Sequence, residues 1–190
     1  MLKSIKMAVV AFLGVSWGAL VCLPVSSQES HLRILAATGN ADQIQRALDG
    51  SAEINKRDAS GVSTLMLAAR SNQDPKVVSL LVRAGASLDN RNRNGETALM
   101  FAAEYNRNPD VIRALISAGA NVLDRDALGR TALMHAAECS TNPDVVTALL
   151  NAGADAKARS VDRKTALDFA QYNESLKGSE ALRALEKATE

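Results

Sequence analysis

The stretch from Gly95 to Leu128, GETALMFAAEYNRNPDVIRALISAGANVLDRDAL, decides the fold because the same 34 positions come round before and after it. Glycine, methionine and proline recur at this step in the three central units, at Gly61, Gly95 and Gly129; Met66, Met100 and Met134; Pro75, Pro109 and Pro143; and Gly85, Gly119 and Gly153. Self-similarity at such a period is the signature of a stacked repeat. The chain is therefore predicted to be a solenoid whose units pack on their neighbours.

One unit is predicted to hold two short antiparallel helices. Thr97 suits the N-cap of the first helix. Asn108 and Pro109 suit the start of the second, because proline at the first helical position loses no hydrogen bond. An apolar stripe at helical spacing follows, formed by Val111, Ile112, Leu115 and Ile116. Gly119 is expected to end this helix in the left-handed conformation, and turn-forming Asp residues then carry the chain through a hairpin.

Two segments, TALMFAA at 97–103 and SAGANVLDRDALG at 117–129, resemble the ankyrin repeat, whose first helix opens with Thr-Pro-Leu-His-x-Ala-Ala. The period is 34 rather than the family's usual 33, with the extra residue in the turn before each Pro. Met stands in place of the motif's His, so the hydrogen bonds of that His are not expected. The resemblance implies an all-α fold, an ankyrin-type helix-turn-helix solenoid of about five repeats with short projecting hairpins.

The predicted units span residues 30–60, 61–94, 95–128, 129–162 and 163–190. His31 and Arg33 of the first unit are expected to face outward, as a terminal unit requires. In the last unit Arg163 stands where the others have Gly, and the second helix is expected to restart at Ser179. The inward residues of that helix are predicted to be Leu182 and Leu185.

Residues 1–27 are interpreted as a secretory signal peptide. Lys3 and Lys6 precede an apolar run from Met7 to Leu23, and Val25 and Ser27 suit the −3 and −1 positions of a cleavage site. The ankyrin-repeat domain is then residues 28–190, and the expected location is periplasmic or secreted. Because the apolar run is long for a leader, an uncleaved inner-membrane anchor is the alternative.

Charge and cysteine content exclude several classes of protein. The chain has 22 Lys and Arg against 21 Asp and Glu, and removal of Lys3 and Lys6 leaves 20 basic residues against 21. A nucleic-acid binder would have a strong basic excess, so no nucleic-acid partner is predicted.

Cys22 lies in the leader, in a context that fits a lipoprotein signal poorly. Cys139 is then the only mature cysteine, which rules out an intramolecular disulfide.

No catalytic residue, metal site or cofactor is predicted. His31 and His135 lie far apart in the expected stack and, with one cysteine, cannot complete a Cys/His zinc cluster. No phosphate-binding glycine motif is present in the sequence. His135 occupies the position of Leu67, Phe101 and Phe169 in the other units, and is interpreted as a partly buried structural residue.

The hairpins and Cys139 each offer a chemical alternative. The hairpin aspartates do not have the spacing of a calcium loop and are interpreted as turn residues; they are Asp89, Asp124, Asp126 and Asp155. Cys139 takes a late position in its first helix, and a reactive or partner-linking thiol there is the alternative to a small residue at a variable site.

The resemblance implies that hairpin tips and first-helix ends line a concave groove that binds another protein. We predict that the partner-binding residues of this groove are Arg70, Arg93, Glu96, Glu104, Tyr105, Leu128, Arg130, Glu138, Lys164 and Tyr172. Arg and Tyr are enriched among binding hot spots.

The function predicted from the sequence is thus an exported, monomeric, non-enzymatic module that binds a protein. A membrane-tethered structural scaffold is the first alternative. A small enzyme built on the repeat scaffold is the second, and it would need a clustered site that the sequence does not reveal.

Overall fold

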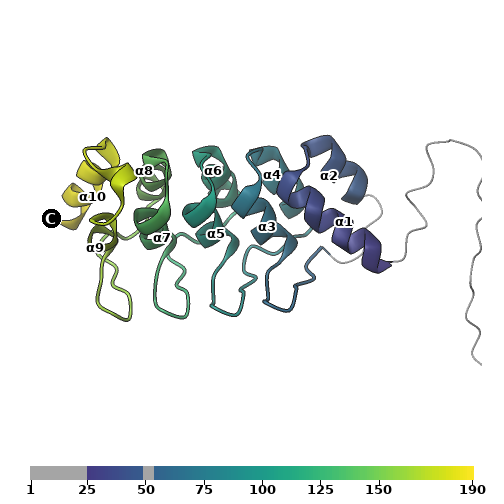
Figure 1. Ribbon diagram of the computed structural model, residues 1–190, viewed down its shortest axis with the longest axis horizontal. Helices are drawn as coiled ribbons and strands as arrows, with labels where there is room; N and C mark the ends of the chain where they lie inside the picture. The colour runs from purple at the N-terminus through teal and green to yellow at the C-terminus, as the bar shows by residue number, and fades with distance from the viewer. Residues whose placement is uncertain (1–24, 49–53) are drawn as a thin grey trace, which may run out of the picture.

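The computed structural model describes residues 25–48 and 54–190, and the helices of this part come in five pairs stacked along one axis (Figure 1). The first helices of the pairs are α1 (Val25–Thr38), α3 (Thr64–Ser71), α5 (Ala98–Tyr105), α7 (Ala132–Cys139) and α9 (Ala166–Ala170). The second helices are α2 (Ala41–Leu48), α4 (Pro75–Arg83), α6 (Pro109–Ser117), α8 (Pro143–Asn151) and α10 (Glu180–Thr189), with a 3₁₀ turn at Glu174–Leu176 before the last. The predicted helical solenoid is confirmed.

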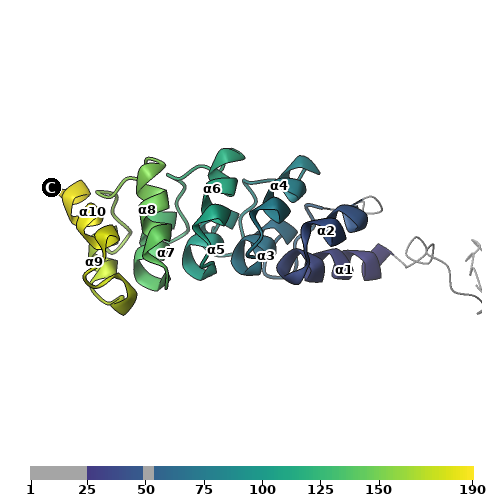
Figure 2. The same cartoon turned by 90° about the horizontal axis from the view of Figure 1, so that it is seen from above.

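The two kinds of helix form two rows, which are seen from above in Figure 2. In the row of first helices, α3 packs between α1 and α5, and α7 packs between α5 and α9. In the other row, α6 packs between α4 and α8. Each helix of the three central units therefore packs against its own partner and against a neighbouring unit on either side, as expected for a repeat that has no core of its own.

The helix starts follow from capping. The side chain of Asn108 accepts a hydrogen bond from the backbone N–H of Asp110, with Pro109 at the first helical position, as predicted. Thr131 caps the first helix of its unit by accepting from the N–H of Met134. Thr97 also occupies the N-cap position, but its side chain makes no capping hydrogen bond.

The core runs through the stack without interruption. Val111, Ile112 and Leu115 are fully buried, whereas Ile116 at the edge of the stripe is partly buried. The methionines that replace the motif's His are also buried. Gly119 follows α6 with φ +105°, which confirms the predicted left-handed end of the helix.

The hairpins project from one side of the stack (Figure 1). Asp126 donates its backbone N–H to the carbonyl of Arg130 and so closes one hairpin. Adjacent hairpins are also linked, because the N–H of Ala127 donates to the carbonyl of Asn94. Within the part that the structure describes, an isolated bridge between Arg57 and Ser63 is the sole β-type pairing, so these hairpins are turns rather than strands.

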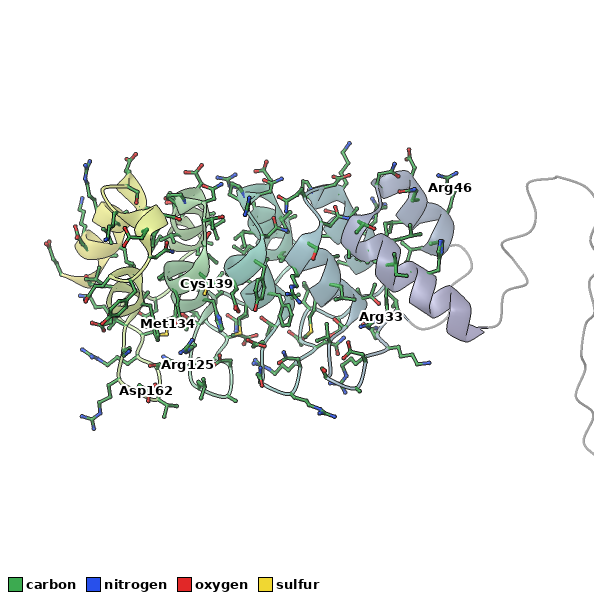
Figure 3. All side chains as sticks on the ribbon, in the orientation of Figure 1. Arg33, Arg46, Arg125, Met134, Cys139 and Asp162 are labelled. Atoms are coloured by element: carbon green, nitrogen blue, oxygen red, sulfur yellow. The ribbon has the colours of Figure 1, made fainter. Side chains whose placement is uncertain are left out.

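Arginines at one hairpin position connect the hairpins in series. The guanidinium of Arg57 donates to the backbone carbonyl of Arg91 at 3.2 Å. Arg91 in turn donates to the carbonyl of Arg125 at 2.8 Å, and Arg125 to that of Arg159 at 2.6 Å. Figure 3 shows Arg125 in its hairpin. These charge-assisted bonds hold the projecting loops in register.

The first unit differs in part from the prediction. His31 is exposed, as expected, but Arg33 does not simply face outward. Its guanidinium donates to the carbonyl of Val62 at 2.9 Å and pairs with Asp58 at 2.8 Å, because the first hairpin offers acceptors within its reach. Ile34 remains exposed on the outer side of α1.

The last unit agrees with the prediction. Ser179 caps α10, Leu185 is fully buried, and Leu182 is partly buried against the core. Arg163 takes a φ of +61°, the left-handed conformation that Gly takes at the equivalent position of the earlier units.

The predicted leader stays a prediction. Its first 24 residues lie outside the described residues, and its last three are the first residues of α1. No helix among the described residues has both the length and the apolar character needed to cross a membrane.

Candidate functional site

Ten residues were predicted to bind a partner, and the structure gathers six of them at one cavity. The cavity has a volume of about 360 Å³ and lies between the third and fourth units. The predicted residues that line it are Arg93, Glu96, Glu104, Leu128, Arg130 and Glu138. Asn94, Asp126, Ala127 and His135 complete the lining. The hairpins supply one wall and the first helices α5 and α7 supply the other.

The other four predicted residues lie outside this cavity, on its two sides. Arg70 from α3 stacks over the ring of Tyr105 from α5, with 4.4 Å between the guanidinium carbon and the ring centroid. Lys164 lies over the ring of Phe169 at 5.6 Å. Tyr172 follows α9 and makes a large exposed surface. The predicted set is therefore one central cavity with an aromatic residue on either side.

Large apolar side chains are exposed along this face. The exposed fractions are 47% for Tyr105, 55% for Leu128, 69% for Val161 and 78% for Tyr172. Val161 and Leu128 are also neighbours, since the N–H of Val161 donates to the carbonyl of Leu128. Val161 takes the repeat position of Ala127, one hairpin further along the groove.

Ion pairs fix some of the charged groups of the cavity. Arg130 pairs with Glu138 at 2.6 Å, and its guanidinium also lies 4.7 Å from the ring centroid of Phe169. Because both ends of this contact are partly buried, Arg130 is held in one orientation. The neighbouring Glu104 carboxylate, together with burial, raises the pKa of Tyr105 to about 12, so the phenol keeps its proton.

His135 is the residue of the site that sequence reasoning placed wrongly in detail. It is only 4% exposed, so it is buried rather than partly buried. Its Nε2 lies 3.1 Å from the Oδ2 of Asp126, and its Nδ1 lies 3.2 Å from the Oε2 of Glu104. Although burial lowers it, the pKa of His135 is raised overall, because Glu104 and Asp126 stabilise the imidazolium.

A signal for this cluster was present in the sequence. His135 is a polar residue at a position that is apolar in the other units, where Leu67, Phe101 and Phe169 stand. A buried polar side chain needs hydrogen-bond partners. The two partners, Glu104 and Asp126, lie in the preceding unit, so only an alignment of neighbouring units side by side would have found them.

Cys139 is exposed at the end of α7 (Figure 3) and follows Glu138 of the cavity lining. Burial of the thiol, together with the carboxylates of Glu104 and Glu138, raises the pKa of Cys139. A raised pKa leaves less of the nucleophilic thiolate at neutral pH. The structure therefore favours a small residue at a variable site over a reactive thiol.

Among the described residues, one group has the composition of a metal site. A ligand atom of each of Glu96, Asp126 and His135 lies within 4.8 Å of the others. No triad of nucleophile, base and acid is evident around it.

Comparison with known proteins gives one finding. A family model of ankyrin repeats, in three copies, matches residues 32–126 and again residues 108–188. No curated protein matches the chain.

Proposed function

This chain belongs to the ankyrin-repeat family, and from that premise we propose that it is an exported, non-enzymatic module that binds another protein through its groove. Ankyrin repeats are generally protein–protein interaction modules, and proteins built from them are typically non-enzymatic scaffolds. The observation that carries the proposal is the row of exposed Tyr105, Leu128, Val161 and Tyr172 beside a polar cavity on one face.

The chemistry of this face suits a protein surface. Aromatic and Arg side chains are enriched among the residues that dominate binding energy. Tyr105 is held by Arg70, and Arg130 is held by Glu138 and Phe169, so neither side chain loses much conformational freedom when a partner docks. Preorganisation of this kind raises affinity because the ordering cost has been met on folding.

The partner is expected to present both apolar and charged groups. Leu128 and Val161 at adjacent hairpin tips offer an apolar contact, while Arg93 and Glu96 offer polar contacts beside it. The chain is expected to act as a monomer, since a single groove with a mixed surface needs no second copy.

An affinity capture tests the proposal. The full chain with a C-terminal tag is expressed beside a groove variant in which Arg93, Tyr105, Leu128 and Arg130 are changed to Ala. A control variant carries four changes on exposed positions of the second helices, Lys76→Ala, Arg83→Ala, Asp110→Ala and Arg113→Ala. A protein retained by the parent and the control but lost by the folded groove variant supports the proposal, and equal retention by all three contradicts it.

The export part of the proposal has a separate test. The intact mass of the protein recovered from the source cell reports whether residues 1–27 have been removed. A mass that begins near Gln28, in the envelope or the medium, supports export. A mass that includes Met1 supports a tethered scaffold instead.

A further inference from the structure

Each ring nitrogen of His135 faces a carboxylate of the cavity lining. Nδ1 faces that of Glu104 at 3.2 Å, and Nε2 faces that of Asp126 at 3.1 Å. When Nδ1 carries the proton and donates to Glu104, Nε2 keeps its lone pair for a ligand. Metal-binding histidines are oriented in this way, by a carboxylate that accepts from the ring nitrogen away from the metal.

Asp126 offers one oxygen to the same place. Its Oδ1 accepts from the backbone N–H groups of Leu128 and Arg130, both at 2.8 Å, and so shapes the turn. Its Oδ2 is the atom that faces His135. Turn formation therefore accounts for one oxygen of this carboxylate and leaves the second directed at the imidazole.

Glu96 supplies the third group. Its Oε2 accepts from the side-chain amides of Asn92 at 2.5 Å and Asn94 at 3.4 Å, so the carboxylate stays beside the cavity. The three ligand atoms lie within 4.8 Å of one another. Donor atoms bound to one ion at about 2.0–2.2 Å lie at most about 4.4 Å apart, so a small inward rotation of the Glu96 side chain brings all three within reach of one ion.

The charge of the cavity favours a cation. Four carboxylates line it, those of Glu96, Glu104, Asp126 and Glu138, against the guanidiniums of Arg93 and Arg130. Arg130 is paired with Glu138 and directed toward the ring of Phe169. Its positive charge is therefore neutralised by Glu138, which is not one of the carboxylates that face His135. With a volume of about 360 Å³ the cavity has space for an ion and the waters that complete its coordination.

The combination is not a general property of the repeat. At the equivalent of Glu96 the second and fourth units have Val62 and Arg130, and at the equivalent of Asp126 the second unit has Asn92. Two hairpins before that of Asp126, the equivalent Asp58 directs its Oδ2 at Arg33 instead. Within residues 25–48 and 54–190, only the seam between the third and fourth units combines an imidazole with two carboxylates at these positions.

We propose that Glu96, Asp126 and His135 bind a divalent transition-metal ion of the zinc class, with Glu104 orienting the imidazole. One imidazole with carboxylates and water suits zinc, cobalt or nickel better than calcium, which prefers six to eight oxygen ligands. The ion joins His135 of α7 to two hairpins, the one that ends at Glu96 before α5 and the one that holds Asp126. It lies inside the face that is proposed to bind the partner. Metal binding is a property beyond the proposed protein binding, and the test of one does not depend on the result of the other.

Isothermal titration of the metal-free full chain with Zn²⁺, and separately with Co²⁺, tests the proposal. A Cys139→Ser background removes the nearby thiol as a ligand. The expected result is one ion per chain, a higher melting temperature with the ion, and an affinity that falls as the pH is lowered, since a proton competes for Nε2. The Co²⁺ spectrum should lack thiolate charge-transfer bands.

Three variants assign the ligands. Glu96→Gln removes one charge at constant shape, and His135→Leu introduces the residue that stands at position 67 of the second unit, so both are expected to fold. Each should abolish the one-to-one event, whereas Glu104→Gln should weaken it about 10–100-fold. His31→Gln, at the exposed histidine, is the control and should bind as the parent does. The proposal is overturned if Zn²⁺ does not bind, or if the event survives in Glu96→Gln and His135→Leu, or if His31→Gln removes it.

Discussion

The side-chain amide of Asn106 donates to the backbone carbonyl of Asn72, one unit earlier, at 2.8 Å. Asn106 also donates to Ala69, and Asn72 makes the corresponding pair of bonds to Ala36 and Gly39. These asparagines lie in the turns whose extra residue sets the period at 34, and they are buried. A buried turn amide thus connects the second unit to the first and the third unit to the second.

The series is interrupted in the fourth unit, where Ser140 stands in the place of Asn. The hydroxyl of Ser140 donates to Asn142 within its own turn. Ser140→Asn should extend the series to the third unit and raise the free energy of unfolding by about 0.5–1.5 kcal/mol, the usual net value of a hydrogen bond. Denaturant unfolding measures it, with Thr141→Asn at the exposed neighbour as the control.

The reverse change should be costly. Asn106→Ala leaves two buried carbonyls without their donor, and a loss of about 1–3 kcal/mol is expected. A neutral Asn106→Ala together with a destabilising Ser140→Asn would refute the role assigned to these amides.

The apolar stripe of α6 gives a second prediction. Leu115→Ala should lower the free energy of unfolding by about 2–5 kcal/mol, because Leu115 is fully buried between units and its removal leaves a cavity. Leu123→Ala, at a leucine that is 53% exposed, should change it by less than about 0.5 kcal/mol. Similar values for the two variants in urea unfolding would mean that the stripe is not core.

A third prediction concerns the left-handed residue of the last hairpin. Arg163 has φ +61°, which costs a residue with a Cβ about 1–2 kcal/mol relative to glycine. Arg163→Gly should therefore raise the melting temperature, because the acceptor that it offers to Arg159 is its backbone carbonyl and is retained. Gly129→Ala is the matched reverse change and should lower it, since its φ is +70° and a Cβ would approach the Val161 nitrogen at 3.3 Å. If both variants melted at the same temperature as the parent, the left-handed conformation at these positions would not limit stability.

A fourth prediction is a pH dependence at Thr165, the N-cap of α9. The backbone N–H and hydroxyl of Thr165, which donate to its carboxylate, hold the pKa of Asp168 below its usual value, against the effect of burial. A carboxyl with a lowered folded-state pKa stabilises fully above its unfolded pKa, near 3.8, and this contribution is lost as the pH falls through the folded pKa. The stability difference between the parent and Asp168→Asn should thus be constant from pH 7 to about pH 5 and shrink below about pH 4. A difference that is the same at pH 7 and at about pH 2 would contradict it.

The helix boundaries of this protein were predictable from its sequence because residues that start or end helices recur at the same positions of each repeat. Asn108 with Pro109, Gly119 and Ser179 mark helix ends by local chemistry, and the structure places each as predicted. The family match covers the same units. Each of these signals is complete within a few neighbouring residues.

Two contacts, those of Arg33 and His135, were not predictable in this way. Arg33 meets Asp58, and His135 meets Glu104, across 25 and 31 residues of chain respectively. Neither pair repeats along the chain, so periodicity gives no hint of them. Each contact forms because a basic side chain of one helix extends to a carboxylate of a neighbouring hairpin or helix. Such pairs can be found only when the sequences of neighbouring units are compared side by side.

The most direct measurement is the equilibrium affinity of the captured partner for three purified chains: the parent, the groove variant and the second-helix control. We predict that the groove variant binds at least about 30-fold more weakly, the equivalent of one hot spot of about 2 kcal/mol. The control should bind within about threefold of the parent, because exposed positions outside an interface contribute little. Equal affinities of the parent and a folded groove variant would contradict the claim that this face binds the partner.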